Sequence, residues 1–289
     1  MANQLTFADG TRAENWLPMI DNRLHLEQDH FFKEVSDYSE DRLYMKHQNF
    51  GDLAKSATLD ANSEFDIVAQ DLQDEVLTCD QNAVAYSSFS PQDLALAQAD
   101  PAMALSKMLN AQVAMIRDDI EDYLVATVLP TFAGAETFAS IDANNVLDVF
   151  DNSVETIMSA GLGGDAKIVA LMSHKFSKYI NKYIRTKVFE KASEETLRYG
   201  YKGTIDEVET YASRRIPNDK VFVYAKDALT ILCPNHGSNG LSYQEHQGPV
   251  SGANKGTTTE VKQTIQLFGA TVFTPNKPFG VVNTLTAFA

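Results

Sequence analysis

The chain has 289 residues, of which 44% are hydrophobic and 22% charged, as in a globular protein that buries a large core in one complex domain or two ordinary ones. Its net charge of −15 argues against tight, sequence-specific DNA binding. No window approaches the roughly 20 consecutive apolar residues of a membrane span, and MANQLTFADGTRAENWLPM lacks the pattern of a secretory signal. The two cysteines, Cys79 and Cys233, exclude a disulfide framework and indicate a reducing compartment.

The acidity is concentrated in the first half of the chain. Residues 1–145 carry 25 acidic and 8 basic side chains, whereas residues 146–289 carry 14 acidic and 16 basic ones. One interpretation is solubility alone. The other is an acidic half that meets a basic surface on another copy, or that faces away from packaged nucleic acid.

The first ninety residues show weak local patterns. LPMIDNRLHLEQ indicates a short helix in a segment that mixes aromatic and charged residues, which suits either an arm that becomes ordered against a partner or a small subdomain. Further along, EFDIVAQ and EVLTCDQNAVAYSS place β-branched and aromatic residues near alternation, with Asp, Asn and Gly between them. We predict a long two-stranded excursion over residues 43–90.

The clearest predicted element is a helix over residues 101–128. Asp100 suits the N-cap and Pro101 the first helical position. Pro130 ends the run, which gives about seven turns and roughly 40 Å. The neighbouring acids Asp118 and Asp119 point about 100° apart on a helix, which favours a solvated or inter-subunit face over a metal or acid–base pair. The apolar stripe is Leu105, Leu109, Val113, Ile116, Ile120, Leu124 and Val128.

An α/β block follows. IDANNVLDVFDNSVETIMSAGLGG predicts a helix with Asp142 as its N-cap and Gly161 as its stop. AKIVALMS predicts a buried strand, and Ser173 suits the cap of a helix in SHKFSKYINKYIRTKVF. One face of that helix is basic. Three interpretations of this face stay open: it is solvated, it contacts an acidic neighbouring subunit, or it contacts nucleic acid. The face comprises Lys175, Lys178, Lys182 and Arg185, of which Lys178 and Lys182 are candidate subunit contacts.

From Thr204 the period becomes two, so TIDEVETYAS and KVFVYAKDALTILC predict strands joined by a turn at residues 217–219, with a bulge near Glu207. Arg214 and Arg215 end the first strand and are candidate subunit contacts. Residues 234–257 predict a polar, glycine-rich loop, and TTEVKQTIQLFGATVFTPNKPFGVVNTLTAF predicts a strand pair. The element order therefore indicates an α+β fold and not an alternating parallel sheet.

Patterns of catalytic chemistry are weak. GYKGT lacks the spacing of a phosphate-binding loop, and GLGG follows a helix where a dinucleotide fingerprint would follow a strand. Cys233, His236 and His246 supply three metal ligands where a structural zinc site needs four. We therefore predict no catalytic, cofactor-binding or metal site. The alternative from another class is a soluble α+β enzyme that uses residues 234–257 as a lid.

Three groups of stretches, taken in order, resemble the major capsid proteins of tailed bacteriophages, which share the Hong Kong 97-type fold. VLTCDQNAVAYSSFSPQDLALAQADPAMALSKMLNAQVAMIRDDIEDYL (76–124) resembles that family's strand, linker and long spine helix. AKIVALMSHKFSKYI (166–180) resembles the strand and helix of its axial domain. KGTIDEVETYASRRIP (202–217), KVFVYAKDALTI (220–231) and IQLFGATVFTPNKPFGVV (265–282) resemble its closing strands.

The resemblance implies an α+β, Hong Kong 97-like capsid fold. Residues 1–42 would be an N-terminal arm and 43–75 an extension loop. Residues 76–139 and 257–289 would build a peripheral domain around a spine helix at 101–128, and 140–256 would be the axial domain.

It also implies a function. The chain would be a non-enzymatic major capsid protein that assembles into hexamers and pentamers of an icosahedral shell around double-stranded DNA. Its partners would be copies of itself, a separate scaffolding protein and a portal, with only non-specific contact with packaged DNA and no membrane. It would be made and assembled in the host bacterial cytoplasm and reside in the virion capsid. An encapsulin-like compartment shell is the alternative with the same fold.

The resemblance adds two candidate subunit contacts, Lys46 and Lys55, in the implied extension loop. Some members of the family crosslink a lysine to an asparagine, and Asn283 is the asparagine near the end of this chain. Nothing in the sequence singles out these side chains as reactive.

Overall fold

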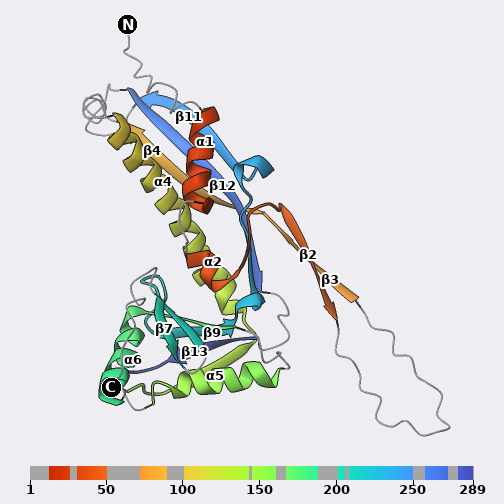
Figure 1. The fold of residues 1–289 in the computed structure, drawn as a ribbon, viewed down its shortest axis with the longest axis vertical. Helices are drawn as coiled ribbons and strands as arrows, with labels where there is room; N and C mark the ends of the chain where they lie inside the picture. Colours follow the sequence, from red (N-terminus) through yellow and green to blue (C-terminus); the bar gives the residue numbers. More distant parts are fainter. Residues whose placement is uncertain are drawn as a thin grey trace, which may run out of the picture.

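The structure is a computed structural model that describes residues 13–26, 31–50, 72–89, 101–142, 145–160, 167–187, 201–205, 208–249, 258–272 and 279–288. Within these residues the strands form a five-stranded sheet, a six-stranded sheet and a two-stranded hairpin. Figure 1 shows two units, one above the other, with the hairpin projecting from the upper one. We call the upper one, built on the five-stranded sheet, the elongated unit, and the lower one, built on the six-stranded sheet, the compact unit.

The elongated unit is organised around one long central strand. The first part of that strand pairs with one neighbour on each side, and its last four residues pair with a further strand. A short parallel strand completes the sheet. The strands are β12 (Thr258–Val272) at the centre, β11 (Leu241–Pro249) and β4 (Gln81–Phe89) beside its first part, β10 (Leu229–Leu232) beside its end, and β1 (Asp37–Ser39) at the edge.

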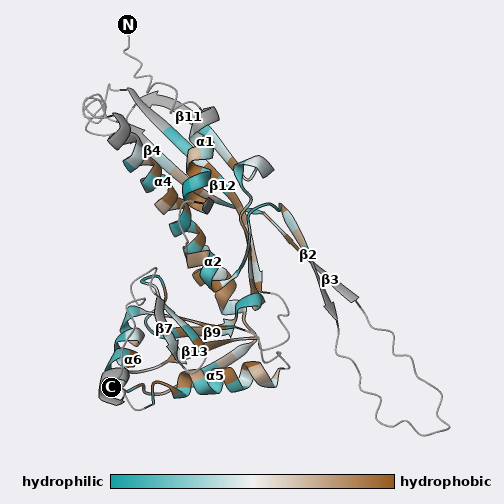
Figure 2. Cartoon of the chain, in the orientation of Figure 1, coloured by the Kyte–Doolittle hydropathy of each residue, from teal (hydrophilic) through white to brown (hydrophobic). Residues whose placement is uncertain are grey.

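The predicted long helix lies along this sheet. Helix α4 (Pro101–Tyr123) continues through a π-helical turn, Leu124–Val128, and a 3₁₀ turn, Leu129–Thr131, so the prediction for residues 101–128 is confirmed. Its stripe is buried from Leu109 to Val128. Figure 2 shows hydrophobic residues gathered where the helix and the sheet face each other. The regular spacing of three or four residues keeps one face of the helix against the sheet throughout.

The N-terminal segment packs on its own chain. Helix α1 (Ala13–Asp21) and the π-helical turn Asn22–Leu26 cross the elongated unit, and α2 (Phe31–Val35) leads into β1. Trp16, Ile20 and Val35 are fully buried in the core that α4 and the sheet share. Where it is described, the predicted arm is therefore part of the folded unit and not an extension that needs a partner.

The compact unit has a mixed sheet with helices packed against it. In spatial order its strands are β5 (Gly134–Phe138), β13 (Gly280–Leu285), β9 (Lys220–Ala225), β6 (Ile168–Met172), β8 (Val208–Ala212) and β7 (Tyr201–Ile205). The helices are α5 (Asp148–Ser159) and α6 (His174–Lys187). Their inner sides meet at Phe150 and Phe176, whose ring centroids lie 6.0 Å apart in an edge-to-face arrangement.

Local capping agrees with one helix prediction and corrects another. The Ser173 hydroxyl accepts a hydrogen bond from the Phe176 backbone N–H at 3.2 Å, as predicted for the start of α6. Helix α5, however, begins at Asp148 and not after Asp142. The side chains of Asp142 and Asn145 accept hydrogen bonds from each other's backbone N–H groups at 3.1 and 2.8 Å, before the helix begins.

The projecting hairpin pairs β2 (Tyr44–Phe50) with β3 (Leu72–Thr78), so the predicted two-stranded excursion exists with a different partner strand. EFDIVAQ lies outside the described residues. EVLTCDQNAVAYSS divides between β3 and β4, which belong to different sheets. At the base of the hairpin, a Cβ on Gly269 of β12 would lie 2.3 Å from the Thr78 carbonyl oxygen, so only glycine allows this close approach.

Three further strand predictions are corrected. TIDEVETYAS contains parts of two antiparallel strands, β7 and β8, and not one strand with a bulge near Glu207. KVFVYAKDALTILC also divides, because a 3₁₀ turn at Lys226–Ala228 carries the chain from β9 in one sheet to β10 in the other. The predicted polar loop contains β11, which pairs with β12 along its whole length. The lid proposed for the alternative enzyme is therefore a sheet strand from residue 241 to 249.

The sheets also correct the implied domain boundaries. Strands β10 and β11 fall within the proposed axial range 140–256 but belong to the sheet of the elongated unit. Strands β5 and β13 fall within the proposed peripheral ranges but belong to the compact unit. The chain crosses between the units more often than a division into continuous segments allows.

Candidate functional site

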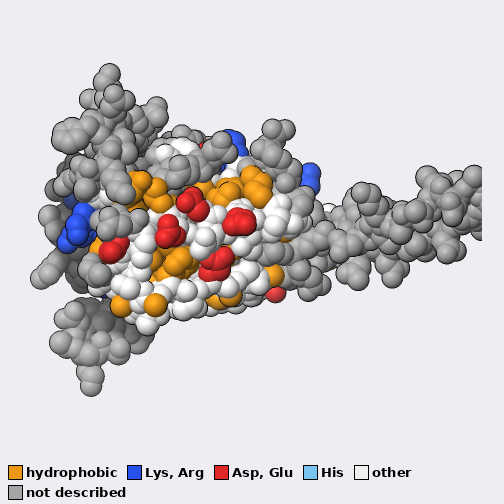
Figure 3. Space-filling view, turned by 90° about the horizontal axis from the view of Figure 1, so that it is seen from below, with side chains coloured by type: hydrophobic (Ala, Val, Ile, Leu, Met, Phe, Trp, Pro, Cys, Tyr) orange, Lys and Arg blue, Asp and Glu red, His pale blue; other side chains and the backbone are white. Residues whose placement is uncertain are grey.

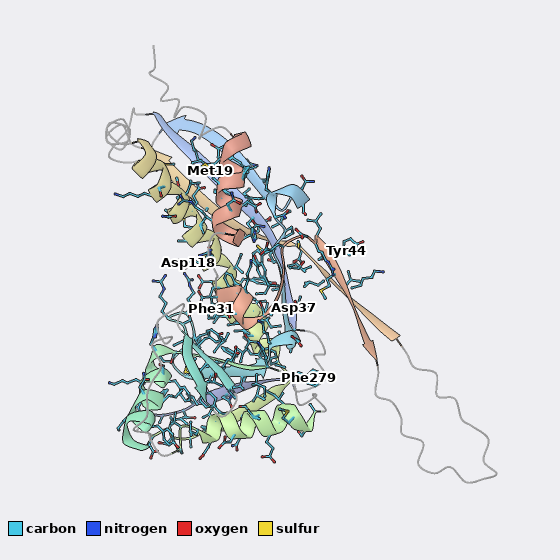
Figure 4. All side chains as sticks on the ribbon, in the orientation of Figure 1. Met19, Phe31, Asp37, Tyr44, Asp118 and Phe279 are labelled. Atoms are coloured by element: carbon cyan, nitrogen blue, oxygen red, sulfur yellow. The ribbon has the colours of Figure 1, made fainter. Side chains whose placement is uncertain are left out.

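The junction between the two units is formed by charged side chains. The loop after β8 places Arg215 against α4, where its guanidinium lies 2.6 Å from Asp118 Oδ1 and 3.5 Å from Glu121 Oε2 and also contacts Asp122. The Ser213 hydroxyl donates to the Glu121 carboxylate. Figure 4 places Asp118 on the lower part of α4, above the loops of the compact unit. The three carboxylates share one face because they lie at positions i, i+3 and i+4 of the helix.

Burial and pairing compete at this junction. The Arg215 side chain is only 14% exposed, whereas that of Asp118 is 44% exposed. Burial raises the pKa of Glu121, and the hydrogen bond from Ser213 and the charge of Arg215 oppose that rise. Arg215 therefore holds three acids of α4 to the compact unit, and we call this group the junction cluster.

Loss of the Arg215 charge is expected to destabilise the folded chain. Arg215→Met keeps the length of the side chain but leaves the half-buried Glu121 carboxylate without its cation. We expect the free energy of unfolding of the protein to fall by about 2 kcal/mol, which is below the cost of breaking a fully buried pair because two of the acids remain hydrated. Urea denaturation at neutral pH measures this.

Arg214→Met is the matched control, since the Arg214 side chain is 75% exposed and lies 3.5 Å from Asp118 Oδ2. Its expected effect is within about 0.5 kcal/mol. Equal losses for the two variants would contradict a structural role for the junction cluster.

Sequence reasoning proposed Arg214 and Arg215 as contacts with another subunit and Asp118 as part of a solvated or inter-subunit face. In the structure these residues have partners within the same chain. Asp119 is also used within the chain, because its carboxylate accepts a hydrogen bond from the Val84 backbone N–H at 3.0 Å. Contact of Arg214 or Arg215 with a neighbouring copy stays a prediction.

The base of the hairpin presents exposed apolar side chains. Leu43, Tyr44 and Val76 are 43%, 62% and 53% exposed. Tyr44 lies on the side of the hairpin that is away from α4 (Figure 4). Lys46 is exposed beside them, in register with Val76 across the hairpin. Lys55 lies outside the described residues. Exposed apolar side chains on a projecting element favour contact with another chain.

The two remaining candidates lie on the outer side of α6. Lys178 and Lys182 are exposed there, four residues apart. Asn283, the residue considered for crosslinking, has the opposite environment: it is fully buried, and its amide donates to the Ser153 hydroxyl at 2.9 Å. Its side chain therefore links β13 to α5, and a lysine of another copy has no access to it in this conformation.

The two cysteines are poor nucleophiles. Burial raises the pKa of the Cys233 thiol to about 12 and that of Cys79 to about 11, so both thiols are protonated at neutral pH. No cluster of three or more potential metal ligands occurs among the described residues. The His246 side chain lies outside those residues. No helix in the described part of the chain is long and apolar enough to cross a membrane.

A sheet backed by one long helix, a compact α/β unit joined to its end and a projecting hairpin together define the Hong Kong 97-type capsid fold. These features identify a fold class. No protein-family model and no curated protein matches the sequence.

Solved structures do match. A structure of Mycobacterium phage Che8 has a TM-score of 0.61 at 11% identity over 88% of this chain and 91% of the other. The capsid structure of cyanophage P-SCSP1u has a TM-score of 0.59 at 10% identity over 91% and 94%. The SrpI encapsulin complex of Synechococcus elongatus has a TM-score of 0.56 at 12% identity over 90% and 89%. The likeness covers nearly the whole of each chain, and at these identities it concerns the fold.

Proposed function

We propose that this chain is the major capsid protein of a tailed, double-stranded DNA bacteriophage. It assembles into hexamers and pentamers of an icosahedral shell that encloses the genome, and it performs no catalysis. The observation that carries the proposal is the fold, which matches a phage capsid over 91% of this chain and 94% of the other. Shell building needs a subunit that contacts several copies of itself, and the projecting hairpin with exposed Leu43, Tyr44 and Val76 supplies one such contact.

In this proposal the compact unit is the axial domain at the capsomer centre, the elongated unit is the peripheral domain, and residues 43–75 are the extension loop. The partners are other copies of the chain, a separate scaffolding protein and a portal. The net charge of −15 limits contact with packaged DNA to a non-specific one. Assembly takes place in the cytoplasm of the host bacterium, and the product is the virion capsid.

The proposal is tested by the state of the purified protein. We expect rings and closed shells in electron micrographs, and fast-sedimenting particles in the ultracentrifuge, when the chain is expressed alone or with the other head genes of its genome. The reason is that each copy presents contact surfaces that only further copies cover. A stable monomer under all of these conditions would refute the function while leaving the fold intact.

The encapsulin-like alternative is supported by the likeness to the SrpI encapsulin. It predicts shells with a protein cargo and no genome, whereas the phage proposal predicts terminase and portal genes beside the gene for this chain. Genomic neighbours and the contents of purified particles separate the two.

A further inference from the structure

Two helices of the compact unit carry opposite charges on their outer sides. In Figure 1, α5 runs along the lower edge of the unit and α6 along an adjacent edge. Because their inner sides meet at Phe150 and Phe176, their outer sides face solvent in different directions. The acidic side of α5 and the basic side of α6 therefore lie on different edges of the compact unit.

The acidic face comprises Asp148, Asp151 and Glu155 of α5, all of them exposed. Val154 and Met158 are half-buried on the same helix, so apolar surface lies beside the charges. Figure 3 views the molecule from this side and shows acidic side chains with hydrophobic ones between them. Helix α5 contains no lysine or arginine.

The basic face comprises Lys175, Lys178 and Lys182 of α6, which are also exposed. The Lys175 ammonium lies 4.2 Å from the centroid of the Phe288 ring, which fixes this end of the face on the compact unit. Tyr179 and Tyr183 are half-buried on the same helix. The part of α6 whose side chains are described, residues 174–183, carries no acid.

The two faces have the same spacing. On each helix the second charge follows the first by three residues and the third follows the second by four. Both sets therefore form a row along about two turns of helix. A row of three acids and a row of three lysines with the same pitch can pair residue by residue, which scattered surface charge cannot do.

We infer that the acidic face of one copy binds the basic face of the next copy in the capsomer, as a head-to-tail contact. The inference rests on the proposed function, because it names the partner of these surfaces within a ring. Two different faces on one subunit form a heterologous contact, and such contacts close into rings when the rotation between copies allows it. When α5 of one copy and α6 of the next run parallel, Lys178 pairs with Asp151 and Lys182 pairs with Glu155.

The matching rows favour a second copy over nucleic acid as the partner of the basic face. A lysine row on a helix also suits phosphates, but DNA would make no use of the matching spacing of the acidic row. A second copy uses both rows at once. Each exposed ion pair stabilises the contact only weakly. Because the contact is repeated around a ring, the summed contribution of these pairs stabilises the capsomer. The contact is also expected to weaken as salt is added.

Reversal of either row is expected to block assembly. Lys178→Glu with Lys182→Glu sets two acidic rows against each other in every ring, and Asp151→Lys with Glu155→Lys sets two basic rows against each other. We expect each double variant to lower the yield of assembled particles by about tenfold or more at physiological salt. Light scattering and sedimentation measure the yield, and circular dichroism verifies that each subunit is folded. Lys107→Glu with Lys167→Glu changes two exposed lysines outside both rows and is the charge-matched control.

Two rescues make the test specific. The quadruple variant has both rows reversed, keeps the net charge of −15 and is expected to assemble like the original chain. A mixture of the two double variants is also expected to assemble, because alternating copies restore every contact. Alternation closes only rings with an even number of copies, so the mixture should yield hexamers without pentamers.

The results of these experiments distinguish a failure of this inference from a failure of the proposed function. Normal assembly of both double variants, or failure of both the quadruple variant and the mixture, overturns the inference while the proposed function stands. Normal assembly of both double variants, with less DNA in the particles of Lys178→Glu with Lys182→Glu, indicates nucleic acid as the occupant of the basic face. Failure of the unmodified chain to assemble refutes the proposed function itself.

Discussion

Replacing Trp16 by alanine is expected to lower the free energy of unfolding by about 3–5 kcal/mol, the range for removing a large buried aromatic side chain. The ring is fully buried between α1, α4 and the sheet. Its Nε1–H donates to Gln112 Oε1 at 3.2 Å and to the Thr264 hydroxyl at 3.3 Å. The Lys262 ammonium lies 5.4 Å from the ring centroid. Alanine therefore leaves a cavity and two buried polar groups that lose a hydrogen-bond donor.

Denaturant unfolding of the unassembled protein, followed by circular dichroism, measures the effect. Trp16→Phe fills most of the cavity but removes the donor, and its expected loss is about 1–2 kcal/mol. Tyr44→Ala removes an aromatic side chain that is 62% exposed, and its expected effect is within about 0.5 kcal/mol. A Trp16→Ala protein as stable as Tyr44→Ala would mean that the N-terminal segment is an arm after all.

The elements that could be predicted are those whose signal is local. Helix α4 has a cap, a stripe and a stop within thirty residues, and β6 is a continuous apolar run. In α6 the Ser173 cap and the stripe agree with each other. Such elements form because one face is apolar at the right period, whatever that face packs against.

The elements that could not be predicted depend on distant segments. Trp16 is the single tryptophan in the chain, yet its partners Gln112 and Thr264 are 96 and 248 residues away. Strand β11 is polar because it borders the sheet, so its sequence resembles a loop. The crossing at residues 226–228 interrupts a run that is apolar on both sides, and nothing local shows that the two halves belong to different sheets.

The junction cluster was only partly predictable. The acids at positions 118, 121 and 122 share a helix face, which indicates a basic partner but not its source. Arg214 and Arg215 are adjacent, and the pattern did not distinguish the one that is held against α4 from the one that is exposed. The basic face of α6 was visible in the sequence, but the positions of α5 and α6 at the edges of the compact unit come from the fold.

Acid is expected to weaken the attachment of the N-terminal segment through His25. Burial, with the nearby charges of Lys33 and Arg117, lowers the pKa of His25 from 6.5 to about 4. Its Nδ1 is 3.0 Å from the Tyr38 hydroxyl, to which it is hydrogen-bonded. The Asp21 carboxylate lies 3.5 Å from Nε2 without making a hydrogen bond to it, so its attraction for the imidazolium is outweighed by burial and by the two cations.

Stability falls in acid because the proton binds His25 more tightly in the unfolded chain than in the folded one. Between about pH 6.5 and pH 4 the unfolded chain carries a proton on His25 that the folded chain does not. Stability from this group is therefore complete above pH 6.5 and falls as the pH is lowered, by at most about 3 kcal/mol when pH 4 is reached. Burial raises the pKa of Asp21, which acts in the opposite direction at the acid end, so the His25 effect is cleanest between pH 5 and pH 7.

The measurement is the slope of the free energy of unfolding against pH in that window, for the original chain and for His25→Gln. Gln cannot take up a proton, so the slope should fall by up to about 1.4 kcal/mol per pH unit, which corresponds to one proton. Identical slopes would show that folding leaves the pKa of His25 unchanged. Because His25 and Trp16 lie on the same short segment, an acid-weakened His25 would loosen the anchor that holds α1 over α4 and β12. In the proposed shells, the N-terminal segments should then lose their order in acid before the subunits unfold.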